Sequence, residues 1–413
     1  MINNKITIGY IFENSPKGGG IFQTEISTGI RLKNLDIENF DIKFFSTNKN
    51  NLDILSKKNF KVEYINKKDF GLNFIKFYNL LTSENLKKLI NYLFKFDSFE
   101  KKLISNKVDF VHFNQMSTLA LMLKKIDYGV SFWDMAHLDY SVFPESKSNY
   151  HSISAREYIY KTLSDSSFYI VTDCQENKSN FLKRFSIVRD KISIVYSEPS
   201  SQLIQSFKQT KEVDVNIIEK LDLKNKEFIF YPAQYWAHKN HVYILEAIHA
   251  LKTKHNKIIK TVFCGAEKNN LDYLISVAGK LGIQKEVIFL NFLNEEEIFN
   301  LYKNSFAIVV PTYFGPTNHL PIEGFYFEKP VLYSDIWSET EQVKGGVIKI
   351  DLKNPEDLAD KLLKLSTDSS FLEDYKLKAK EKYKEITIKI DKSQNTFKKL
   401  FESYRTLKKN FKN

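Results

Sequence analysis

Residues 313–335, YFGPTNHLPIEGFYFEKPVLYSD, contain a turn, a helix and a strand in immediate succession. Two aromatic residues lead into a polar Gly-Pro-Thr-Asn turn, and a helix-like run with the lone carboxylate Glu323 follows. Lys329-Pro330 ends that run, because proline cannot continue a helix. An apolar strand then runs to Asp335. The order of turn, helix and short apolar strand predicts one repeat of an α/β protein with a parallel sheet.

The same alternation runs through the whole chain. Short β-branched or aromatic runs are separated by spacers of helix length, which indicates βαβ units. In the first half we expect strands at 5–12, 41–46, 109–113, 128–133, 168–172 and 192–195. In the second half we expect them at 227–233, 260–265, 287–292, 307–312, 330–335 and 347–350. Because the pattern occurs twice, it predicts two doubly wound domains.

The division between the domains is expected near residue 205, because residues 196–216 are polar and contain no strand pattern. A chain of 413 residues is also too long for one ordinary core. We therefore predict an N-terminal domain over 1–205, a C-terminal domain over 206–390 and a tail over 391–413. Apolar residues in the tail recur at helical spacing, which predicts an amphipathic helix packed across the domain junction.

Composition excludes several classes of protein. The chain is 43% apolar and 27% charged, as in soluble globular proteins, and no apolar run is long enough to span a membrane. The N-terminus lacks the pattern of a signal peptide, and Cys174 and Cys264 have no metal or redox spacing. We expect free thiols and a cytoplasmic location. The net charge of +11 suggests an anionic partner, but no clustered basic stripe predicts nucleic-acid binding.

Two loops have the composition of anion sites. Gly18, Gly19 and Gly20 follow the first strand and precede a helix that begins near Ile21, with neither GxGxxG nor P-loop spacing. Backbone amides at a helix start suit a phosphate, and a flexible surface turn is the alternative. Lys239 enters the first helix of the second half and can neutralise a phosphate; an ordinary solvated lysine is the alternative.

A third polar segment places Asp134, His137 and Asp139 within six residues, directly after a strand. A carboxylate and an imidazole there can position or exchange a proton, although a hydrogen-bonded pair of loop side chains is the alternative. Ser-His-Asp hydrolysis is disfavoured, because the chain has no GxSxG elbow. His238 and His241 have no third ligand nearby, so we expect no metal site.

Together these motifs resemble glycosyltransferase family 4, the retaining GT-B enzymes. The resemblance rests on the segment from Phe263 to Asp335 and on the glycine loop, WDMAHLDY…FPE and QYWAHKNH, which occur in the family's order. The last two motifs are similar to those of a polysaccharide-building subgroup. The resemblance implies a GT-B fold, in which two Rossmann-like domains face a central cleft. The N-terminal domain would bind the acceptor and the C-terminal domain the nucleotide sugar.

The implied reaction is transfer of a hexosyl group from a nucleotide-diphosphate sugar to an acceptor hydroxyl, with retention of configuration. Such enzymes need no cofactor and no metal ion. The acceptor would be a saccharide or a lipid-linked saccharide, in the synthesis of cell-surface polysaccharide or lipopolysaccharide.

The resemblance also implies site residues. Glu323, the second glutamate of a Glu-x7-Glu motif, would hold the ribose hydroxyls of the donor; without the resemblance it would be an exposed first-turn glutamate. Asp134 and His137 would be catalytic residues that position the acceptor hydroxyl, or His137 would contact the donor sugar, because the family's key histidine corresponds to Trp133. The expected donor-binding residues are Gly18, Gly19, Gly20, Gln234, Lys239, Gly315, Pro316, Thr317, Asn318, His319, Leu320 and Glu323.

Two positions depart from the family pattern. Gly315 stands where the first glutamate of the motif is expected, and Gln234 stands where a diphosphate-binding arginine is expected. The first change removes a carboxylate that often contacts the donor sugar. The second change removes a positive charge from the leaving-group site.

Other functions remain open. A nucleotide-sugar epimerase or hydrolase would use the same scaffold, and a non-enzymatic protein would bind nucleic acid or a membrane surface through its basic charge. Residues 73–107 carry seven lysines against three acidic residues, together with many aromatic and leucine residues. They predict either contact with the inner face of an anionic membrane or ordinary helices whose apolar face belongs to the core.

Overall fold

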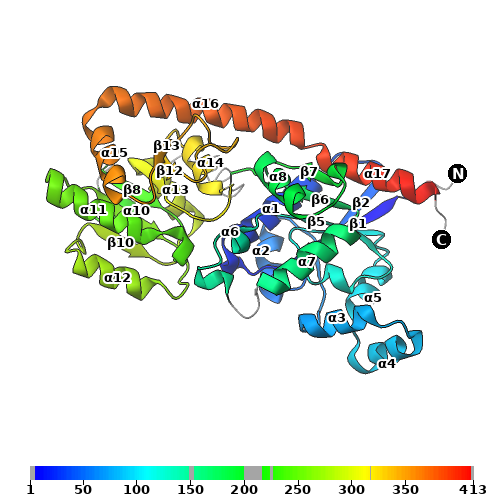
Figure 1. The fold of residues 1–413 in the computed structure, drawn as a ribbon. Coiled ribbons are helices and arrows are strands. Elements are labelled where there is room, and N and C mark those ends of the chain that lie inside the picture. Colours follow the sequence, from blue (N-terminus) through cyan, green and yellow to red (C-terminus); the bar gives the residue numbers. More distant parts are fainter. Residues whose placement is uncertain (1–4, 148–152, 200–215, 224–226, 317, 411–413) are drawn as a thin grey trace. The chain divides into compact units, whose positions relative to one another are not determined.

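The computed structural model describes residues 5–147, 153–199, 216–223, 227–316 and 318–410 (Figure 1). The chain forms two compact units, each built on its own sheet. Unit 1 comprises residues 1–133, 149–196 and 392–413, and unit 2 comprises residues 134–148 and 197–391. None of the helices in the described ranges is both long enough and apolar enough to cross a membrane.

Unit 1 contains a seven-stranded parallel sheet in the order β3-β2-β1-β4-β5-β6-β7. Its strands are β1 (Ile6–Phe12), β2 (Phe40–Ser46), β3 (Val62–Tyr64), β4 (Phe110–Phe113), β5 (Asp127–Ser131), β6 (Tyr169–Thr172) and β7 (Ile192–Ile194). Its helices are α1 (Gly20–Lys33), α2 (Leu52–Lys57), α3 (Leu72–Leu80), α4 (Glu84–Phe94), α5 (Ser98–Ser105), α7 (Ile153–Ser166), α8 (Gln175–Arg184) and α17 (Thr396–Asn410).

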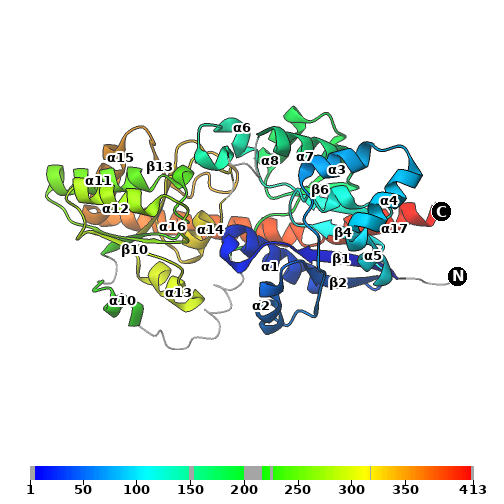
Figure 2. The ribbon, with the colours of Figure 1, turned by 90° about the horizontal axis from the view of Figure 1, so that it is seen from below.

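Unit 2 contains a six-stranded parallel sheet in the order β10-β9-β8-β11-β12-β13. Its strands are β8 (Phe228–Tyr231), β9 (Lys260–Cys264), β10 (Val287–Leu290), β11 (Ala307–Val310), β12 (Val331–Ser334) and β13 (Ile348–Ile350). Its helices are α6 (Ala136–Asp139), α10 (Asn216–Lys220), α11 (His241–His255), α12 (Leu271–Lys280), α13 (Glu295–Asn304), α14 (His319–Tyr326), α15 (Pro355–Thr367) and α16 (Ser369–Ser393), whose last two residues fall within unit 1. Figure 2 shows α11, α12 and α15 on one side of this sheet and α10 and α13 on the other.

The α/β fold with two doubly wound parallel sheets is therefore confirmed, and each of the twelve predicted strands is present. The strand β3 was not predicted from the sequence pattern. This strand has three residues, all half-buried, with Glu63 at its centre, so it shows neither an apolar run nor an alternating pattern.

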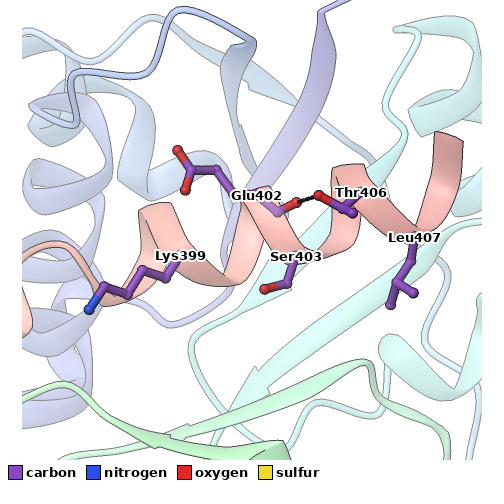
Figure 3. Close-up of a pocket in the computed structure, with 5 residues that line it drawn as sticks. All are labelled: Lys399, Glu402, Ser403, Thr406 and Leu407. Atoms are coloured by element: carbon purple, nitrogen blue, oxygen red, sulfur yellow. Dashed lines mark hydrogen bonds between the residues drawn. The ribbon is translucent and has the colours of Figure 1, made fainter.

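The tail forms the predicted amphipathic helix, α17, and packs on the core of unit 1. Phe397, Phe401 and Tyr404 are buried among apolar side chains of the unit 1 sheet. The Tyr404 ring lies 4.6 Å from that of Phe110, and its hydroxyl donates a 2.9 Å hydrogen bond to Asp127 Oδ2. Another part of the helix lines a surface pocket with Lys399, Glu402, Ser403, Thr406 and Leu407 (Figure 3).

Residues 134–148 differ from the predicted domain limits, because they pack with unit 2 although unit 1 flanks them in sequence. The physical reason is a contact surface made of aromatic rings and a hydrogen-bonded pair. Tyr140 and Phe143 lie against Phe314, with ring centroids 6.0 and 5.3 Å apart, and Glu145 pairs with His238. The division predicted at residue 205 falls within 200–215, outside the described residues. Both cysteines are buried free thiols, as expected.

The two sheets have the same topology. In each sheet the first three strands along the chain lie in order on one side, and the later strands lie in order on the other side of the first strand. The order therefore reverses between β1 and β4 in unit 1 and between β8 and β11 in unit 2. Open α/β sheets bind ligands at the carboxyl ends of the strands beside such a switch point.

Candidate functional site

The loops that follow β8 and β11 meet at the switch point of unit 2. The two strands are hydrogen-bonded neighbours, with Ile308 opposite Phe230, so their carboxyl ends lie side by side. The amide of Tyr313 donates a 3.0 Å hydrogen bond to the carbonyl of His238 and ties the loops together. The predicted Lys239 and the predicted turn at 315–320 are therefore brought to one place.

A glycine at the end of β9 lets the loop after β8 take its path. A Cβ atom added to Gly265 would lie 2.4 Å from the carbonyl oxygen of Ala233, closer than any real Cβ contact. Only glycine permits this backbone approach. The tight packing fixes the start of the segment that carries Gln234 and Lys239.

Lys239 ends a short 3-10 turn, Ala237–Lys239, and its carbonyl accepts a 3.0 Å hydrogen bond from the hydroxyl of Tyr231. Burial lowers the pKa of its ammonium group to about 8, although nearby Asp134 and Glu145 act in the opposite direction. Within the described part of the chain, no hydrogen bond or ion pair engages this ammonium group. A desolvated cation of this kind is stabilised by a bound anion such as phosphate.

The segment with the predicted catalytic residues lies in the same unit as Lys239. Asp134 accepts a 2.9 Å hydrogen bond from the amide of Ala136 and so fixes the start of α6. His137, in α6, is completely buried, whereas Asp139 is exposed. Partial desolvation of its carboxyl group, together with the nearby charge of Asp134, raises the pKa of Asp139. The charge of Asp134 also acts on the pKa of Lys239, whereas the imidazole of His137 lies in the interior.

A buried pair of hydrogen-bonded side chains, Glu145 and His238, connects the same segment to the loop after β8. Oε1 of Glu145 accepts a 2.9 Å hydrogen bond from the amide of His238 and also pairs with Nδ1 of that residue. The imidazole of His238 is stacked on Phe314, with ring centroids 4.1 Å apart and planes inclined by 7°. These contacts link three segments that are remote in sequence.

The turn before α14 is held by the side chain of Asn318. Its Nδ2 donates hydrogen bonds of 3.0 Å to the carbonyl of Gly315 and 2.9 Å to the hydroxyl of Tyr333. Gly315 has a φ of 84°, which favours glycine. Pro316 is buried and Leu320 is half-buried. Thr317 lies outside the described residues. A helix of eight residues, α14, begins at His319.

Glu323 is buried, with 7% of its surface exposed, and its Oε2 accepts a 2.6 Å hydrogen bond from the hydroxyl of Tyr302. The alternative of an exposed first-turn glutamate is therefore wrong. Close packing holds this part of α14 against the sheet, because a Cβ atom on Gly324 would lie 2.6 Å from Cγ2 of Val331. The carboxylate has a defined position.

Two other predicted donor residues have partners within unit 2. Oε1 of Gln234 accepts a 2.9 Å hydrogen bond from Nε1 of Trp236. Nδ1 of His319 donates a 3.0 Å hydrogen bond to the carbonyl of Glu198. These side chains contribute to the shape of the loops around Lys239 and α14.

The predicted glycine loop belongs to unit 1 and lies at its own switch point, after β1. Gly19 has φ 67° and ψ −128°, a conformation open only to glycine, and α1 begins at the next residue. The buried carboxylate of Glu25 accepts hydrogen bonds from the amides of Glu13 and Asn14 and from Nδ2 of Asn14. Burial raises the pKa of Glu13 to about 6 and that of Glu25 to about 8, and in Glu25 the charge of Glu13 adds to this effect.

Sequence reasoning missed Glu145, Phe314 and Tyr302 as parts of the site, and considered His238 only as a metal ligand. Glu145 and His238 are separated by 93 residues, and Tyr302 and Glu323 by 21. A pattern of neighbouring residues cannot predict a pairing between side chains this far apart in the sequence. The motif FPE, which ends at Glu145, was the one available signal.

Residues 214–382 match the family model for glycosyl transferases group 1. An uncharacterized glycosyltransferase of Methanocaldococcus jannaschii is 24% identical over 215 residues, which are 49% of this chain and 52% of that protein. The chain thus matches about half the length of this relative.

Three solved structures share the fold along nearly the whole chain. A glycosyltransferase from Rickettsia africae has a TM-score of 0.69 at 18% identity, over 96% of this chain and 99% of its own. HepE of Anabaena, in complex with UDP-glucose, has a TM-score of 0.69 at 11% identity, over 96% and 100%. The UDP-GlcNAc 2-epimerase of Neisseria meningitidis, bound to UDP-GlcNAc, has a TM-score of 0.61 at 16% identity, over 96% and 100%. The GT-B fold is therefore established, and it occurs both in a transferase and in an epimerase.

Proposed function

We propose that the chain is a retaining glycosyltransferase that moves a hexosyl group from a nucleotide-diphosphate sugar to an acceptor hydroxyl. The observation that carries this proposal is the site at the switch point of unit 2. There the loop after β8 carries the desolvated ammonium group of Lys239. The neighbouring strand, β11, leads to the start of α14, and α14 contains the buried Glu323. The match of residues 214–382 to glycosyl transferases group 1 supports it.

Each part of the site suits one part of such a donor. The carboxylate of Glu323 can accept hydrogen bonds from the two ribose hydroxyls, since a carboxylate has lone pairs beyond those used by Tyr302. The amides of His319 and Leu320, in the first turn of α14, and the charge of Lys239 suit the diphosphate. No metal ion or cofactor is required by this assignment.

The same groups would stabilise the departing diphosphate. As the glycosidic bond breaks, negative charge develops on the leaving group, and fixed positive charges in a dry site stabilise that charge better than water does. Because Gln234 replaces an expected arginine, Lys239 would carry a larger share of this task. Asp134, whose charge acts on the pKa of Lys239, would orient the acceptor hydroxyl.

The proposed acceptor is a saccharide or lipid-linked saccharide, in the synthesis of cell-surface polysaccharide or lipopolysaccharide on the cytoplasmic side of the membrane. Retention, acceptor and pathway rest on the resemblance to family 4. UDP is the first nucleotide to test, because HepE, which shares the fold, has been crystallised with UDP-glucose.

Contact with a membrane would occur through an apolar patch on α3 and α4 of unit 1. Seven of the eighteen large apolar side chains that are exposed in the described residues lie here, among them Tyr92 at 81% and Leu80 at 80% exposed. Leu86, Leu89 and Leu93 form an exposed stripe along α4, which is anchored by the buried Ile90. The patch consists of Phe77, Leu80, Leu86, Leu89, Tyr92, Leu93 and Phe94.

Exposed lysines lie next to this patch. Lys88 is on α4 and Lys95 directly follows it, and both are exposed. Burial lowers the pKa of Lys124, Glu100 opposes this effect, and the charge of Lys87 lowers the pKa further, so Lys87 and Lys124 are near neighbours. An apolar patch with a basic border favours an anionic lipid surface.

The donor site is tested by thermal unfolding of the protein with UDP, GDP, ADP, CMP or buffer. A ligand at 100 times its Kd stabilises the folded state by about 2.7 kcal/mol, which is readily seen. We expect one diphosphate to raise the Tm, and Lys239→Ala and Glu323→Ala to lose the shift. Lys344→Ala, which changes an exposed lysine of unit 2, should keep it. Absence of any shift in the wild-type protein would contradict the proposal.

The reaction is tested with the nucleotide sugar of the diphosphate that binds. Transfer of the sugar to an added saccharide acceptor, with the anomeric configuration of the donor kept in the product as observed by proton NMR, supports a retaining transferase, whereas release of the sugar to water alone supports a hydrolase. Conversion of the intact nucleotide sugar into its epimer would instead assign the protein to the epimerases that share its fold.

Membrane contact is tested by co-sedimentation with vesicles of phosphatidylglycerol and phosphatidylcholine, against pure phosphatidylcholine. We expect binding to the anionic vesicles at low salt, and its loss on Lys87→Glu/Lys88→Glu or on Leu89→Ser/Leu93→Ser. Lys344→Glu is the charge-matched control on unit 2. Equal sedimentation of all variants, or none, would remove this part of the proposal.

A further inference from the structure

Glu145 has one carboxylate oxygen in use and one without a partner. Its side chain is 10% exposed, and Oε1 is bound by the amide and Nδ1 of His238. Oε2 is buried and accepts no hydrogen bond from any residue in the described part of the chain. A buried carboxylate oxygen without a donor is costly, so the arrangement is suited to a donor that a ligand brings.

The charge state of the pair leaves this oxygen as an acceptor. Burial lowers the pKa of His238 to about 4, so the imidazole is neutral at pH 7. Burial raises the pKa of Glu145, but its hydrogen bonds with His238 outweigh burial and lower that pKa below its usual value. The neutral imidazole therefore donates its Nδ1 proton to an ionised Oε1. Oε2 shares the negative charge of the carboxylate and can act only as a hydrogen-bond acceptor.

The position of Glu145 connects it with the nucleotide-sugar site. His238 directly precedes Lys239, and the charge of Glu145 acts on the pKa of Lys239. His238 is also stacked on Phe314, the residue before Gly315. At position 315 the chain lacks the carboxylate that family 4 members commonly direct to the donor sugar. The structure thus places an unused carboxylate oxygen near the point where the motif has lost one.

We propose that Glu145 binds the donor sugar, with Oε2 accepting a hydrogen bond from a sugar hydroxyl. The carboxylate that Gly315 lacks would then be supplied from residues 134–148, which pack with unit 2. His238 would act as a positioning residue that orients Glu145. This inference rests on the proposed function, because it requires a nucleotide sugar at Lys239.

Loss of the Glu145 charge should affect binding of the nucleotide sugar but not binding of the free diphosphate. A hydroxyl bound to a carboxylate is a charge-assisted hydrogen bond, and its loss should weaken binding about 10- to 100-fold. Glu145→Gln keeps the size of the side chain and an oxygen for the amide and Nδ1 of His238, but it removes the charge. The variant should bind the free diphosphate as the wild-type protein does and bind the nucleotide sugar more weakly.

The experiment is calorimetric titration of the wild-type protein, Glu145→Gln and Glu145→Ala with UDP, GDP and ADP and with UDP-glucose, GDP-mannose and ADP-glucose. For Glu145→Gln we expect an unchanged Kd for the diphosphate that binds. For the nucleotide sugar that contains this diphosphate, we expect the Kd to be about 10- to 100-fold larger than in the wild-type protein. His238→Gln, which disturbs the orientation of Glu145, should show a smaller loss of the same kind.

The outcomes separate this inference from the function on which it rests. If the wild-type protein binds none of the probes, the donor site itself is absent and both ideas fall. Alternatively, the wild-type protein binds a diphosphate and the corresponding nucleotide sugar, while Glu145→Gln weakens the binding of both ligands equally or of neither. In that case the donor site stands and Glu145 is a structural residue only. Unfolding of Glu145→Ala would leave Glu145→Gln to decide, since its shape is retained.

Discussion

The hydroxyl of Tyr302 donates a 2.6 Å hydrogen bond to Oε2 of Glu323, in the interior of unit 2. Tyr302 is on α13 and Glu323 is on α14, so the bond fixes the carboxylate relative to two helices. Burial raises the pKa of Tyr302 well above its usual value, and the charge of Glu323 raises it further. The tyrosine therefore stays protonated and acts as a permanent donor.

Tyr302→Phe should destabilise unit 2 more than an ordinary loss of a tyrosine hydroxyl. The variant leaves a buried carboxylate oxygen without its donor, at a cost of about 1.5–3 kcal/mol. The matched control is Tyr235→Phe, whose hydroxyl donates to the neutral carbonyl of Leu290 and whose loss should cost about 1 kcal/mol. Urea unfolding followed by tryptophan fluorescence, to which Trp236 and Trp337 of unit 2 contribute together with Trp133 of unit 1, measures both. Equal losses would show that the charge of Glu323 does not strengthen the bond.

Nucleotide binding should weaken as the pH rises through the pKa of Lys239. Its pKa is about 8, so the ammonium group is charged at pH 7 and mostly neutral at pH 9. Because only the charged form attracts phosphate, the affinity for the diphosphate should fall by up to about tenfold per pH unit above pH 8. Titration calorimetry between pH 6.5 and 9.5 measures this fall and the accompanying uptake of protons.

Lys239→Arg provides the control for that pH profile, because the guanidinium group stays charged throughout this range. Its affinity, whatever its absolute value, should be nearly constant with pH. A wild-type profile as flat as that of the arginine variant would contradict the assignment of Lys239 to the anion site.

Phe401→Ala should strongly destabilise unit 1. Phe401 is fully buried on α17, and its ring lies 5.9 Å from Phe40 and 6.3 Å from Phe110. Removing a phenyl ring from a packed core costs about 3–5 kcal/mol. Leu407→Ala, on the part of the same helix that lines the pocket of Figure 3, should change stability by less than about 0.5 kcal/mol. Urea unfolding followed by circular dichroism compares them; similar small effects would place α17 outside the core.

Gly265→Ala should damage the site through the backbone. The new methyl group would meet the carbonyl of Ala233, which must move and take the loop with Lys239 along; we expect a loss of about 1–3 kcal/mol. Gly279→Ala, in α12, is the control, since its methyl group would meet only Gln284 Nε2 at 3.5 Å. It should stabilise the protein by about 0.5–1 kcal/mol. Thermal unfolding and UDP titration report both effects, and a Gly265→Ala protein with wild-type binding would contradict the argument.

The elements could be predicted from the sequence because their signals are local. Buried parallel strands such as β8 and β11 are continuous apolar runs, and turns and helix starts are marked by residues such as Gly315 and Asn318. The edge strand β3 escaped, since a half-buried strand of three residues carries no such signal. The order of strands also placed Lys239 and the turn before α14 after strands of the same half.

Contacts between remote segments could not be predicted in this way. The sequence assigned residues 134–148 to the first half, whereas their aromatic side chains and Glu145 pack on loops of unit 2. Glu323 was expected at the surface of a first turn unless a family pattern applied, and it is buried against Tyr302. In both cases the partner is supplied by another element.

The sequence by itself determined the α/β class, the alternation of strands and helices, and the loops in which Lys239, Gly315 and Glu323 would lie. Those features depend on interactions within a few residues, which periodicity and turn chemistry record. Only the tertiary structure decided that Glu145 pairs with His238, that Tyr302 holds Glu323, and that Lys239 is a half-buried cation with a lowered pKa. Burial and pairing arise when the sheet brings distant loops together, so no local pattern of residues encodes them.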